Sequence, residues 1–202
     1  SRGVQFIDPE EGELACGTNG PGRLANLDKI LNWVKKHFEK VQDLCGIKIL
    51  ITAGPTHEPL DPVRYLSNPS SGKMGYSIAG QAQARGAEVI LISGPTHLKP
   101  PAGAGFKSCK TAEEMSQLVN EFLPEFDVLI MSAAVGDFTA EKLEKEKIKK
   151  QSGEGRILNL VPTKDILMEV SKIKTHQFVV GFAAETQNLV QSALEKLRNK
   201  KL

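Results

Sequence analysis

The stretch "IKILITAGPT", residues 47–56, decides the fold of this chain. It is a short apolar run that ends in Gly-Pro, which is typical of a strand buried on both faces of a parallel sheet. Two similar runs follow, "AEVILISGP" at 87–95 and "FDVLIMSAA" at 126–134. Helix-like segments separate the three runs. Strands and helices that alternate in this order predict an α/β fold with an open, doubly wound parallel sheet.

The segments between these strands have helical features. "GYSIAGQAQARG", residues 75–86, places small Ala and Gly side chains where a helix would pack closely on the sheet. Thr111 and Glu114 have the spacing of a capping box before an apolar helical face. Another helix is expected near 164–173, between two further strand candidates, "ILNLV" (157–161) and "QFVVGFAAET" (177–186). The expected architecture is Rossmann-like, with three layers in the order αβα.

The first 44 residues differ in character from the rest. They are rich in Gly and Pro up to about residue 24, and Asn26 can cap a helix that follows. "EKVQDLCG", residues 39–46, has the composition of a linker. We therefore divide the chain into residues 1–44 and 45–202. The sheet pattern predicts another strand after the terminal "KKL", so we expect the second part to be incomplete at its C-terminus.

Composition excludes several classes of function. The chain has 202 residues, 40% hydrophobic and 25% charged, which is typical of a globular protein. A net charge of +2 gives no reason to expect nucleic acid or a membrane surface as a partner. No apolar run approaches the roughly 20 residues of a membrane span. Three widely spaced cysteines argue against a disulfide framework, and we expect a cytoplasmic protein.

Parallel sheets bind ligands at the carboxyl ends of their strands. Three turns of small residues lie at such ends: "AGPT" (53–56), "SAAVGD" (132–137) and "GFAAET" (181–186). Backbone can approach a ligand closely in turns of this kind. Asp137 ends the second turn, where its carboxylate could meet a base, a ribose or a metal ion.

The long loop "RYLSNPSSGKMG", residues 64–75, resembles the end of a Walker A motif but does not fit it. The first Gly of that motif is replaced by Ser67, and the residue after Lys73 is Met74. The Gly-x-Gly-x-x-Gly dinucleotide fingerprint is also missing after the first strand. The loop is either an anion-binding helix start or a solvated loop with a helix cap.

Other charged positions also have two interpretations. Lys147 and its lysine neighbours lie in a charged segment, 138–156, which is either a solvated loop or a lid that carries a lysine onto a polyphosphate. Lys196 and Lys200, four residues apart, share one helix face, and such pairs usually line a solvated surface. The four histidines lack metal-site spacing.

Four motifs in order point to a family. "ITAGPTHEPLDPVRYLSNPSSGKMG" (51–75), "SAAVGDF" (132–138), "EKIKKQ" (146–151) and "VVGFAAET" (179–186) closely resemble the bacterial phosphopantothenate–cysteine ligases of coenzyme A biosynthesis. The resemblance runs from about residue 47 to the end. The segment through "LACGTNGPGRL" (14–24) resembles the C-terminal tail of the flavin-dependent phosphopantothenoylcysteine decarboxylase, which bacteria commonly fuse ahead of the ligase.

The resemblance implies a two-step reaction. The carboxylate of 4'-phosphopantothenate attacks the α-phosphate of CTP, which gives an acyl-cytidylate and pyrophosphate. The amine of L-cysteine then displaces CMP and forms the amide. The family pattern also implies Mg²⁺ with the triphosphate, without assignable metal ligands, and a homodimer. FMN belongs only to the decarboxylase domain, which is absent.

Residue roles follow from the same resemblance. Lys147 matches the family lysine that is needed to form the acyl-cytidylate. Asn68 matches the asparagine that binds this intermediate, and Arg64 matches an arginine implicated in the cysteine step. Cys16 matches the decarboxylase proton donor and is expected to be inert without the flavin-binding part. The positions that match CTP contacts are Met131, Ser132, Ala133, Asp137, Lys147, Lys164, Asp165, Ile166, Leu167, Phe182, Lys196 and Lys200. At 163–166 the family has Asn-Pro-Asp-Ile where this chain has "TKDI".

Two rival functions stay open. The first is an NAD(P)-dependent oxidoreductase of Rossmann type, against which the missing glycine fingerprint and the missing Tyr-x-x-x-Lys count. The second is a nucleotide-binding fragment without turnover. The residue pattern by itself does not distinguish CTP from ATP.

Overall fold

The computed structural model describes residues 6–13, 17–38, 41–150, 155–183, 191, 194, 196–198 and 200. It divides into two compact units, Ser1–Val41 and Gln42–Leu202. In the described part of the chain, no helix is long and apolar enough to cross a membrane.

The first unit is small. Strands β1 (Glu10–Glu13) and β2 (Asn19–Arg23) pair antiparallel, and helix α1 (Leu27–Phe38) follows. The Asn26 carboxamide oxygen accepts a hydrogen bond from the Asp28 amide at 2.8 Å, which confirms the predicted helix start. Leu27 and Leu31 on this helix are 75% and 50% exposed. The unit therefore buries little apolar surface of its own.

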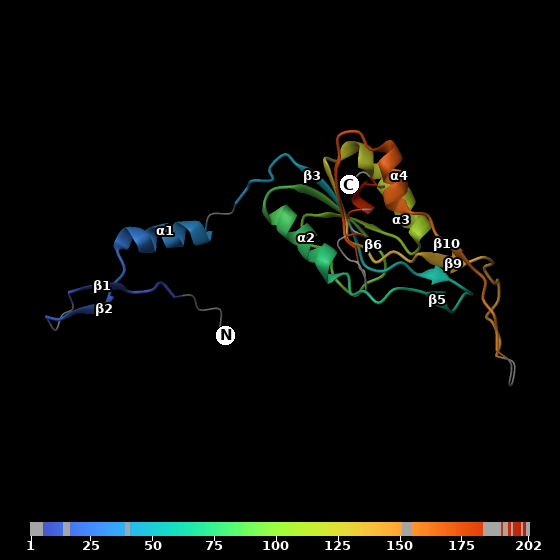
Figure 1. Cartoon of the computed structure of the whole chain (residues 1–202), viewed down its shortest axis with the longest axis horizontal. Coiled ribbons are helices and arrows are strands. Elements are labelled where there is room, and N and C mark those ends of the chain that lie inside the picture. The colour runs from blue at the N-terminus through green and yellow to red at the C-terminus, as the bar shows by residue number, and fades with distance from the viewer. Residues whose placement is uncertain are drawn as a thin grey trace. The chain divides into compact units, whose positions relative to one another are not determined.

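The second unit contains a five-stranded sheet in the order β11-β8-β3-β6-β7, in which every neighbouring pair is parallel (Figure 1). The predicted α/β fold is confirmed. Crossovers between parallel strands are usually helical, and helices cover both faces of this sheet, although the connection from β6 to β7 has none. The strands are β3 (Lys48–Ala53), β6 (Glu88–Ser93), β7 (Gly105–Ser108), β8 (Val128–Met131) and β11 (Phe178–Gly181).

Alternate residues of β3 face two different cores. Ile49 and Ile51 pack under helix α2 (Lys73–Ala84). Leu50, on the opposite face, packs with residues of α3 (Ala112–Phe122) and α4 (Ile166–Ile173). Figure 1 shows α2 on one side of the sheet and α3 with α4 on the other. This two-residue alternation produces the three predicted layers.

Helix α2 lies very close to the sheet because its buried face carries small side chains. Ala79 is fully buried. At Gly75, an added Cβ would lie 2.5 Å from Ala53 Cβ and 2.6 Å from Ser132 Oγ. The preceding Gly72 has a φ of 73°, a left-handed conformation that other residues rarely adopt. The two glycines therefore let the start of α2 reach the carboxyl ends of β3 and β8.

Helix α3 has the predicted N-cap. The Glu114 amide donates to Thr111 Oγ1 at 3.2 Å. The Glu114 carboxylate, however, accepts from the Lys110 amide at 2.6 Å, one residue before the position that a standard capping box uses. Met115 and Val119 are fully buried, so the predicted apolar face of the helix is confirmed. Helix α3 continues into the short 3₁₀ helix η1 (Leu123–Glu125).

One strand prediction was wrong in its placement, and one strand of the five-stranded sheet was missed. The apolar run 157–161 does not enter the sheet: Ile157 is 91% exposed, and β10 (Leu160–Pro162) pairs antiparallel with β9 (Phe138–Ala140) in a separate ladder. The fifth strand of the sheet is β7, "GFKS", an exposed edge strand. Edge strands need little apolar surface, so β7 has no apolar run in the sequence.

Candidate functional site

The turns after β3 and β8 meet beyond the carboxyl edge of the sheet. The Ala134 amide donates to the Gly54 carbonyl at 2.8 Å, and the Thr56 amide donates to the Ala134 carbonyl at 3.3 Å. Pro55 and Ala134 also form a parallel β-bridge. The predicted turns "AGPT" and "SAAVGD" therefore lie side by side and form one structure at this edge.

Side chains of the second turn fix its backbone. Ser132 Oγ donates to the Thr52 carbonyl at 2.5 Å, and the Ala133 amide donates to Thr52 Oγ1 at 3.2 Å. Met131 is buried, with its sulfur 3.6 Å from the Thr52 hydroxyl. These side chains and the Ala133 amide already have partners in the protein. A ligand at residues 131–133 would meet main-chain carbonyls rather than side-chain groups.

Threonines join this turn to the start of α4. The Gly136 amide donates to Thr56 Oγ1 at 2.8 Å. Thr163 Oγ1 donates to the Gly136 carbonyl at 2.6 Å, and the Thr163 amide donates to the Asp137 carbonyl at 2.9 Å. The predicted residues 137 and 164–165 are therefore neighbours in space, although they are far apart in the sequence.

Asn68 lies against the same turn. Its amide nitrogen donates to the Val135 carbonyl at 2.9 Å, and the preceding Ser67 hydroxyl donates to the Thr56 carbonyl at 2.7 Å. The Asn68 carboxamide oxygen receives no hydrogen bond from any residue that the structure describes. The long loop after β3 thus returns to the carboxyl edge, and it holds Asn68 there with one polar atom available for a ligand.

Asp165 caps helix α4 and binds Lys200. Its Oδ1 accepts from the Met168 amide at 3.1 Å, and its Oδ2 lies 2.7 Å from Lys200 Nζ. Burial alone would raise the pKa of the Asp165 carboxyl, but the hydrogen bonds from Lys200 and Met168 outweigh it and lower the pKa. The ionised pair brings the C-terminal lysine to the start of α4.

Three other predicted positions surround this pair. Lys164 Nζ lies 2.8 Å from Glu113 Oε1, which raises the pKa of Lys164 and lowers that of Glu113. The Ile166 side chain is buried in the core, so a ligand could reach only its backbone, whereas Leu167 packs against the core and is partly exposed.

Phe182 lies near the carboxyl edge, and Lys196 lies one helical turn before Lys200. Gly181 in β11 pairs with Met131 in β8, so the next residue, Phe182, lies at the level of the 132–137 turn and is 53% exposed. Residues 196–198 are helical, and the Lys200 amide donates to the Lys196 carbonyl at 2.9 Å. The predicted one-face arrangement of the two lysines is therefore supported by the helical bond between them.

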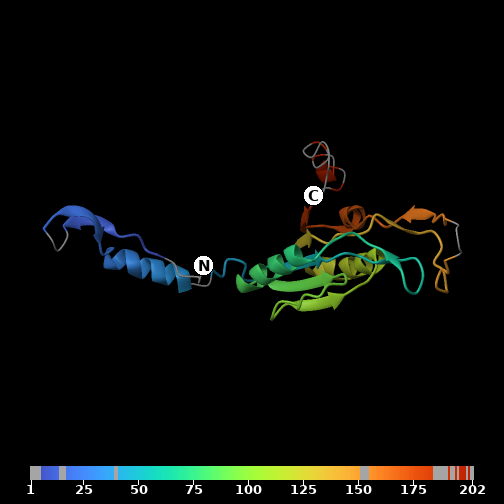
Figure 2. The same cartoon turned by 90° about the horizontal axis from the view of Figure 1, so that it is seen from below.

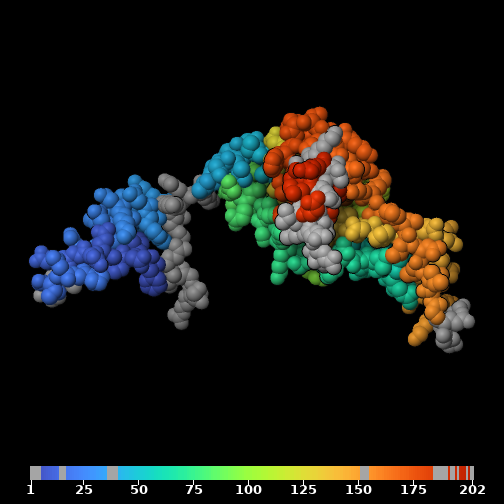
Figure 3. All heavy atoms as spheres, in the orientation of Figure 1, coloured from blue at the N-terminus to red at the C-terminus, as the bar shows by residue number. Residues whose placement is uncertain are grey.

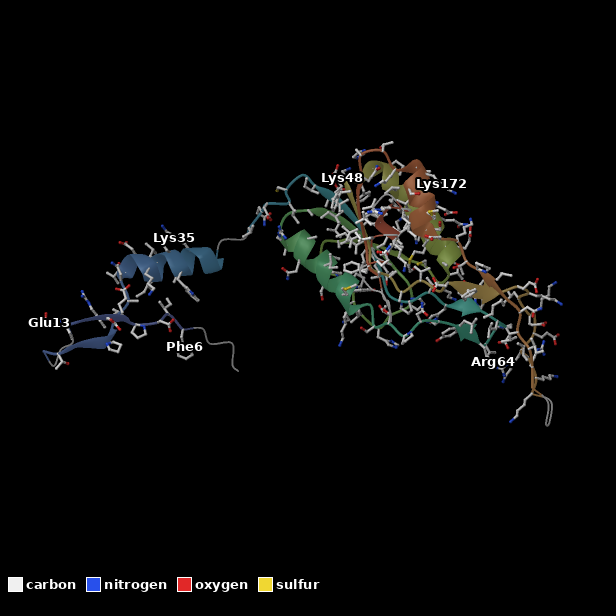
Figure 4. The ribbon with its side chains drawn as sticks, viewed as in Figure 1. Phe6, Glu13, Lys35, Lys48, Arg64 and Lys172 are labelled. Carbon is white, nitrogen blue, oxygen red and sulfur yellow. The ribbon has the colours of Figure 1, made fainter. Side chains whose placement is uncertain are left out.

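Arg64 and Lys147 form a second group, next to the hairpin of β4 (Glu58–Pro59) and β5 (Tyr65–Leu66). Arg64 lies at the opposite end of the unit from Lys48, the first residue of β3 (Figure 4). Its guanidinium donates to the Ile148 carbonyl at 2.9 Å. Lys147 itself is exposed, and no residue that the structure describes forms a hydrogen bond or ion pair with its ammonium group.

The hairpin and segment 141–150 project together from one end of the unit. Figure 2 shows them extending beyond the carboxyl edge of the sheet, and in Figure 3 their atoms form a single projection. The Glu144 amide donates to the Leu60 carbonyl at 3.1 Å, so the two segments are hydrogen-bonded as well as adjacent. The structure therefore brings Arg64 to Ile148, the residue after Lys147, and Asn68 to the 132–137 turn.

A protein-family model described as the DNA/pantothenate metabolism flavoprotein C-terminal domain matches residues 44–202. The chain belongs to this family. Two relatives are bifunctional coenzyme A biosynthesis proteins, CoaBC: one from Escherichia coli (strain K12), 45% identical over 205 residues, and one from Bacillus subtilis (strain 168), 46% identical over 203 residues. These alignments cover 100% and 99% of this chain, which spans about half the length (50%) of each relative.

A solved structure confirms the fold of this flavoprotein C-terminal domain. The crystal structure of the C-terminal domain of a coenzyme A biosynthesis bifunctional protein CoaBC superposes with a TM-score of 0.70 and 42% sequence identity. The match covers 79% of this chain and 76% of that one. A DNA/pantothenate metabolism flavoprotein from Streptococcus pneumoniae is 26% identical, with a TM-score of 0.68 over 77% of this chain and 79% of that one.

Two buried carboxylates of this flavoprotein domain were not among the predicted residues. Glu58 is 4% exposed, and its Oε1 accepts from the Ala112 amide at 2.8 Å, at the start of α3. Asp61 is 3% exposed and binds both Arg64 and the Ile148 amide. An Asp before Pro in "LDPVR" is a turn signal, which indicates local structure only. Neither long-range contact is visible in the sequence.

A cavity of about 350 Å³ adjoins the predicted residues of this family member. Thr111, Thr139, Thr163 and Lys164 are among its lining residues, so it opens between the start of α3 and the β9–β10 ladder. The lining is mixed: it also includes the carboxylates of Glu58 and Glu113 and the apolar side chains of Pro59, Ala140, Leu143 and Pro162. The cavity lies next to Thr163, whose backbone and hydroxyl group bind the 136–137 turn.

The free cysteines that the structure describes are Cys45, which is exposed, and Cys109, which is buried. Cys16 lies outside the described residues. Burial raises the pKa of the Cys109 thiol to about 12, so Cys109 is not a thiolate at neutral pH. Within the described ranges, no group of three His, Cys, Asp or Glu side chains could hold a metal ion.

Proposed function

We propose that this chain carries a CTP-dependent phosphopantothenate–cysteine ligase, which joins 4'-phosphopantothenate to L-cysteine through an acyl-cytidylate. The observation that carries this proposal is the match to the family over residues 44–202, with 45% identity to a bifunctional coenzyme A biosynthesis protein. The geometry supports it, because Asn68 and the 132–137 turn meet at the carboxyl edge, where parallel sheets bind nucleotides.

In the first step, a carboxylate oxygen of 4'-phosphopantothenate bonds to the α-phosphorus of CTP, and the bond to pyrophosphate breaks. Negative charge grows on the phosphate oxygens as this happens. Lys147, exposed on the projecting segment, is the cation that we assign to this charge. Lys196 and Lys200 are assigned to the triphosphate from the other side, near the start of α4.

In the second step, the cysteine amine bonds to the acyl carbon, CMP leaves with the electrons of the acyl–oxygen bond, and the amine loses a proton. The carbonyl oxygen carries negative charge in between, so amide donors are required. Asn68 is held by Val135 and is assigned to the intermediate. Arg64 is assigned to the cysteine step.

We assign the nucleotide base and ribose to residues 131–137 and Phe182. Since the side chains at 131–133 are already engaged, the base would be read mainly through main-chain groups. Asp137 would face the ribose. The described residues provide no cage for Mg²⁺, which in nucleotide sites keeps phosphate oxygens and water as ligands. We expect Mg²⁺ to arrive with the triphosphate, and no step above depends on it.

Two further parts of the proposal concern the whole protein. Residues 1–44 are proposed to be the C-terminal tail of a decarboxylase domain, with Cys16 as its proton donor and FMN as the cofactor of the rest of that domain. The ligase is proposed to act as a homodimer. Support for the first part comes from the relatives, which are bifunctional proteins about twice as long as this chain, while the homodimer rests on the family resemblance alone.

The test is pyrophosphate release from CTP that depends on 4'-phosphopantothenate. Lys147→Gln is expected to lower this rate by about 100-fold or more, because the phosphate charge loses its cation. Asn68→Asp is expected to leave the first step intact and to accumulate the acyl-cytidylate, since a carboxylate facing the Val135 carbonyl loses the hydrogen bond that orients residue 68. Lys145→Gln, on the same exposed segment, is the matched control and is expected to react normally.

The outcomes separate the rival functions. An oxidoreductase would release no pyrophosphate, and a fragment without turnover would bind CTP and leave it intact. Competition between ATP and CTP shows which nucleotide the protein prefers. Normal amide synthesis by both Lys147→Gln and Asn68→Asp would contradict the assigned roles.

A further inference from the structure

The Asp61 carboxylate accepts hydrogen bonds from four donor groups. Its side chain is fully buried. One oxygen, Oδ1, accepts from the amides of Val63 and Arg64 at 2.7 and 2.8 Å. The other, Oδ2, accepts from the Arg64 guanidinium and from the Ile148 amide, both at 3.0 Å. Burial opposes ionisation, but these hydrogen bonds outweigh it and lower the pKa of Asp61, so it is ionised at neutral pH.

The two oxygens bind different parts of the chain. The bonds of Oδ1 close a local turn, as Asp side chains commonly do before Pro. Oδ2 also accepts from the Arg64 side chain within the hairpin, but its bond to the Ile148 amide spans 87 residues of sequence and is not needed for that turn. The bond to Ile148 connects the hairpin to segment 141–150.

Ile148 is held through both of its backbone groups. Its amide donates to Asp61, and its carbonyl accepts from the Arg64 guanidinium at 2.9 Å. Asp61, Arg64 and Ile148 therefore form a closed ring of hydrogen bonds. Lys147 directly precedes Ile148 and is exposed. The ring fixes the backbone next to Lys147 and leaves its side chain to reach outward.

We propose that Asp61 is a positioning residue that anchors Ile148, and thereby the Lys147 segment, for the proposed ligase reaction. The inference rests on the proposed function. It also gives Arg64 a second role, because the same guanidinium that is assigned to the cysteine step completes the anchor of Lys147. Misplacing a reacting group by about 1 Å costs on the order of 100-fold in rate, so loss of an anchor at this position should lower the reaction rate strongly.

Asp61→Asn tests the anchor in the full chain. The Asn carbonyl can replace Oδ1 and keep the local turn, whereas its NH₂ group would face the donors on Ile148 and Arg64. We expect the Ile148 amide to exchange its hydrogen at least about 10-fold faster, as an amide that loses its acceptor does. We expect kcat for pyrophosphate release to fall by about 10- to 100-fold. The Kd for CTP should change less than about 3-fold, because every position matched to a CTP contact except Lys147 lies outside the anchored segment.

Glu144→Gln is the matched control. It removes an exposed ion pair with Arg156, 3.0 Å long, from the same segment but leaves the Ile148 anchor in place. Both exchange and kcat should stay at the parent values. A general loss of stability in Asp61→Asn would instead raise exchange throughout the sheet and weaken CTP binding together with kcat, and this result would overturn the proposal of a local anchor.

Hydrogen exchange needs no substrate, so it separates the two proposals. If the parent chain releases no pyrophosphate, the proposed function fails, and faster exchange at Ile148 in Asp61→Asn still supports the anchor. Parent-like protection of Ile148 in that variant would overturn the anchor. Faster exchange with an unchanged kcat in an active chain would overturn its role in positioning Lys147.

Discussion

At the scale of single residues, the structure of the carboxyl edge depends on a position that has no side chain. Gly75 has no side chain, and this lets helix α2 contact the ends of β3 and β8. An added Cβ would lie 2.5 Å from Ala53 Cβ and 2.9 Å from the Thr52 carbonyl oxygen. Thr52 also holds Ser132 and Ala133, so a shift of α2 would disturb the predicted nucleotide turn.

We therefore expect Gly75→Ala to lower the free energy of unfolding by about 1–3 kcal/mol, the usual cost of overpacking a core. CTP binding should weaken as well. Urea unfolding and titration calorimetry measure the two effects. Gly80→Ala in the same helix is the matched control, because its Cβ would lie 3.8 Å from Pro101, an ordinary contact. Replacing Gly by Ala within a helix should then stabilise by roughly 0.5–1 kcal/mol. Equal effects of the two substitutions would contradict close packing at Gly75.

At the scale of elements, a side chain from a hairpin completes the start of a helix. Two acceptors serve the first turn of α3: Thr111 Oγ1 binds the Glu114 amide, and Glu58 Oε1 binds the buried Ala112 amide. Glu58 belongs to β4, so this hydrogen bond ties the hairpin that carries Arg64 to the body of the domain. A carboxylate also suits the positive end of the helix dipole.

Glu58→Ala is expected to cost about 1–3 kcal/mol, because it leaves the Ala112 amide buried without an acceptor. Glu58→Gln keeps an acceptor oxygen and should lose less than about 1 kcal/mol, mainly the charge–dipole part. Thermal unfolding of the two variants gives the comparison. If Gln cost as much as Ala, the negative charge rather than the hydrogen bond would be what stabilises the helix start.

The strands also show which parts of the fold can be predicted from the sequence. Long apolar runs such as "IKILITA" predicted β3, β6, β8 and β11 correctly, and for the interior strands the reason is that strands covered on both faces must be apolar throughout. β7 was missed because an exposed edge strand needs no such run. The run at 157–161 was misassigned because apolar residues also occur in exposed ladders: Leu160 is 44% exposed.

The candidate site divides in a similar way. The three strand-end turns could be located in advance, since the carboxyl ends of parallel strands share one edge. The hydrogen bond from Asn68 to Val135 and the ring of Asp61, Arg64 and Ile148 could not. Each depends on the path of a long loop, and local residue preferences do not determine where such a loop returns to the protein.

At the scale of the molecule, the two units differ in what stabilises them. Both apolar cores and the whole parallel sheet lie within residues 42–202. In residues 1–41 the helix α1 keeps Leu27 at 75% and Leu31 at 50% exposure. Folding stability scales with apolar surface removed from water, so the second unit supplies nearly all of it.

A fragment of residues 42–202 is therefore expected to fold as stably as the whole chain. Loss of groups outside a core changes stability by less than about 0.5 kcal/mol, which corresponds to a Tm shift below about 2 °C for a domain of this size. Its Kd for CTP should also be unchanged, because every residue assigned to the nucleotide lies beyond 130. A fragment of residues 52–202 lacks most of the central strand β3 and should not fold, which shows that the assay detects a broken core. A large fall in Tm or a loss of CTP binding on removing residues 1–41 would mean that the first unit contributes to the stability of the second.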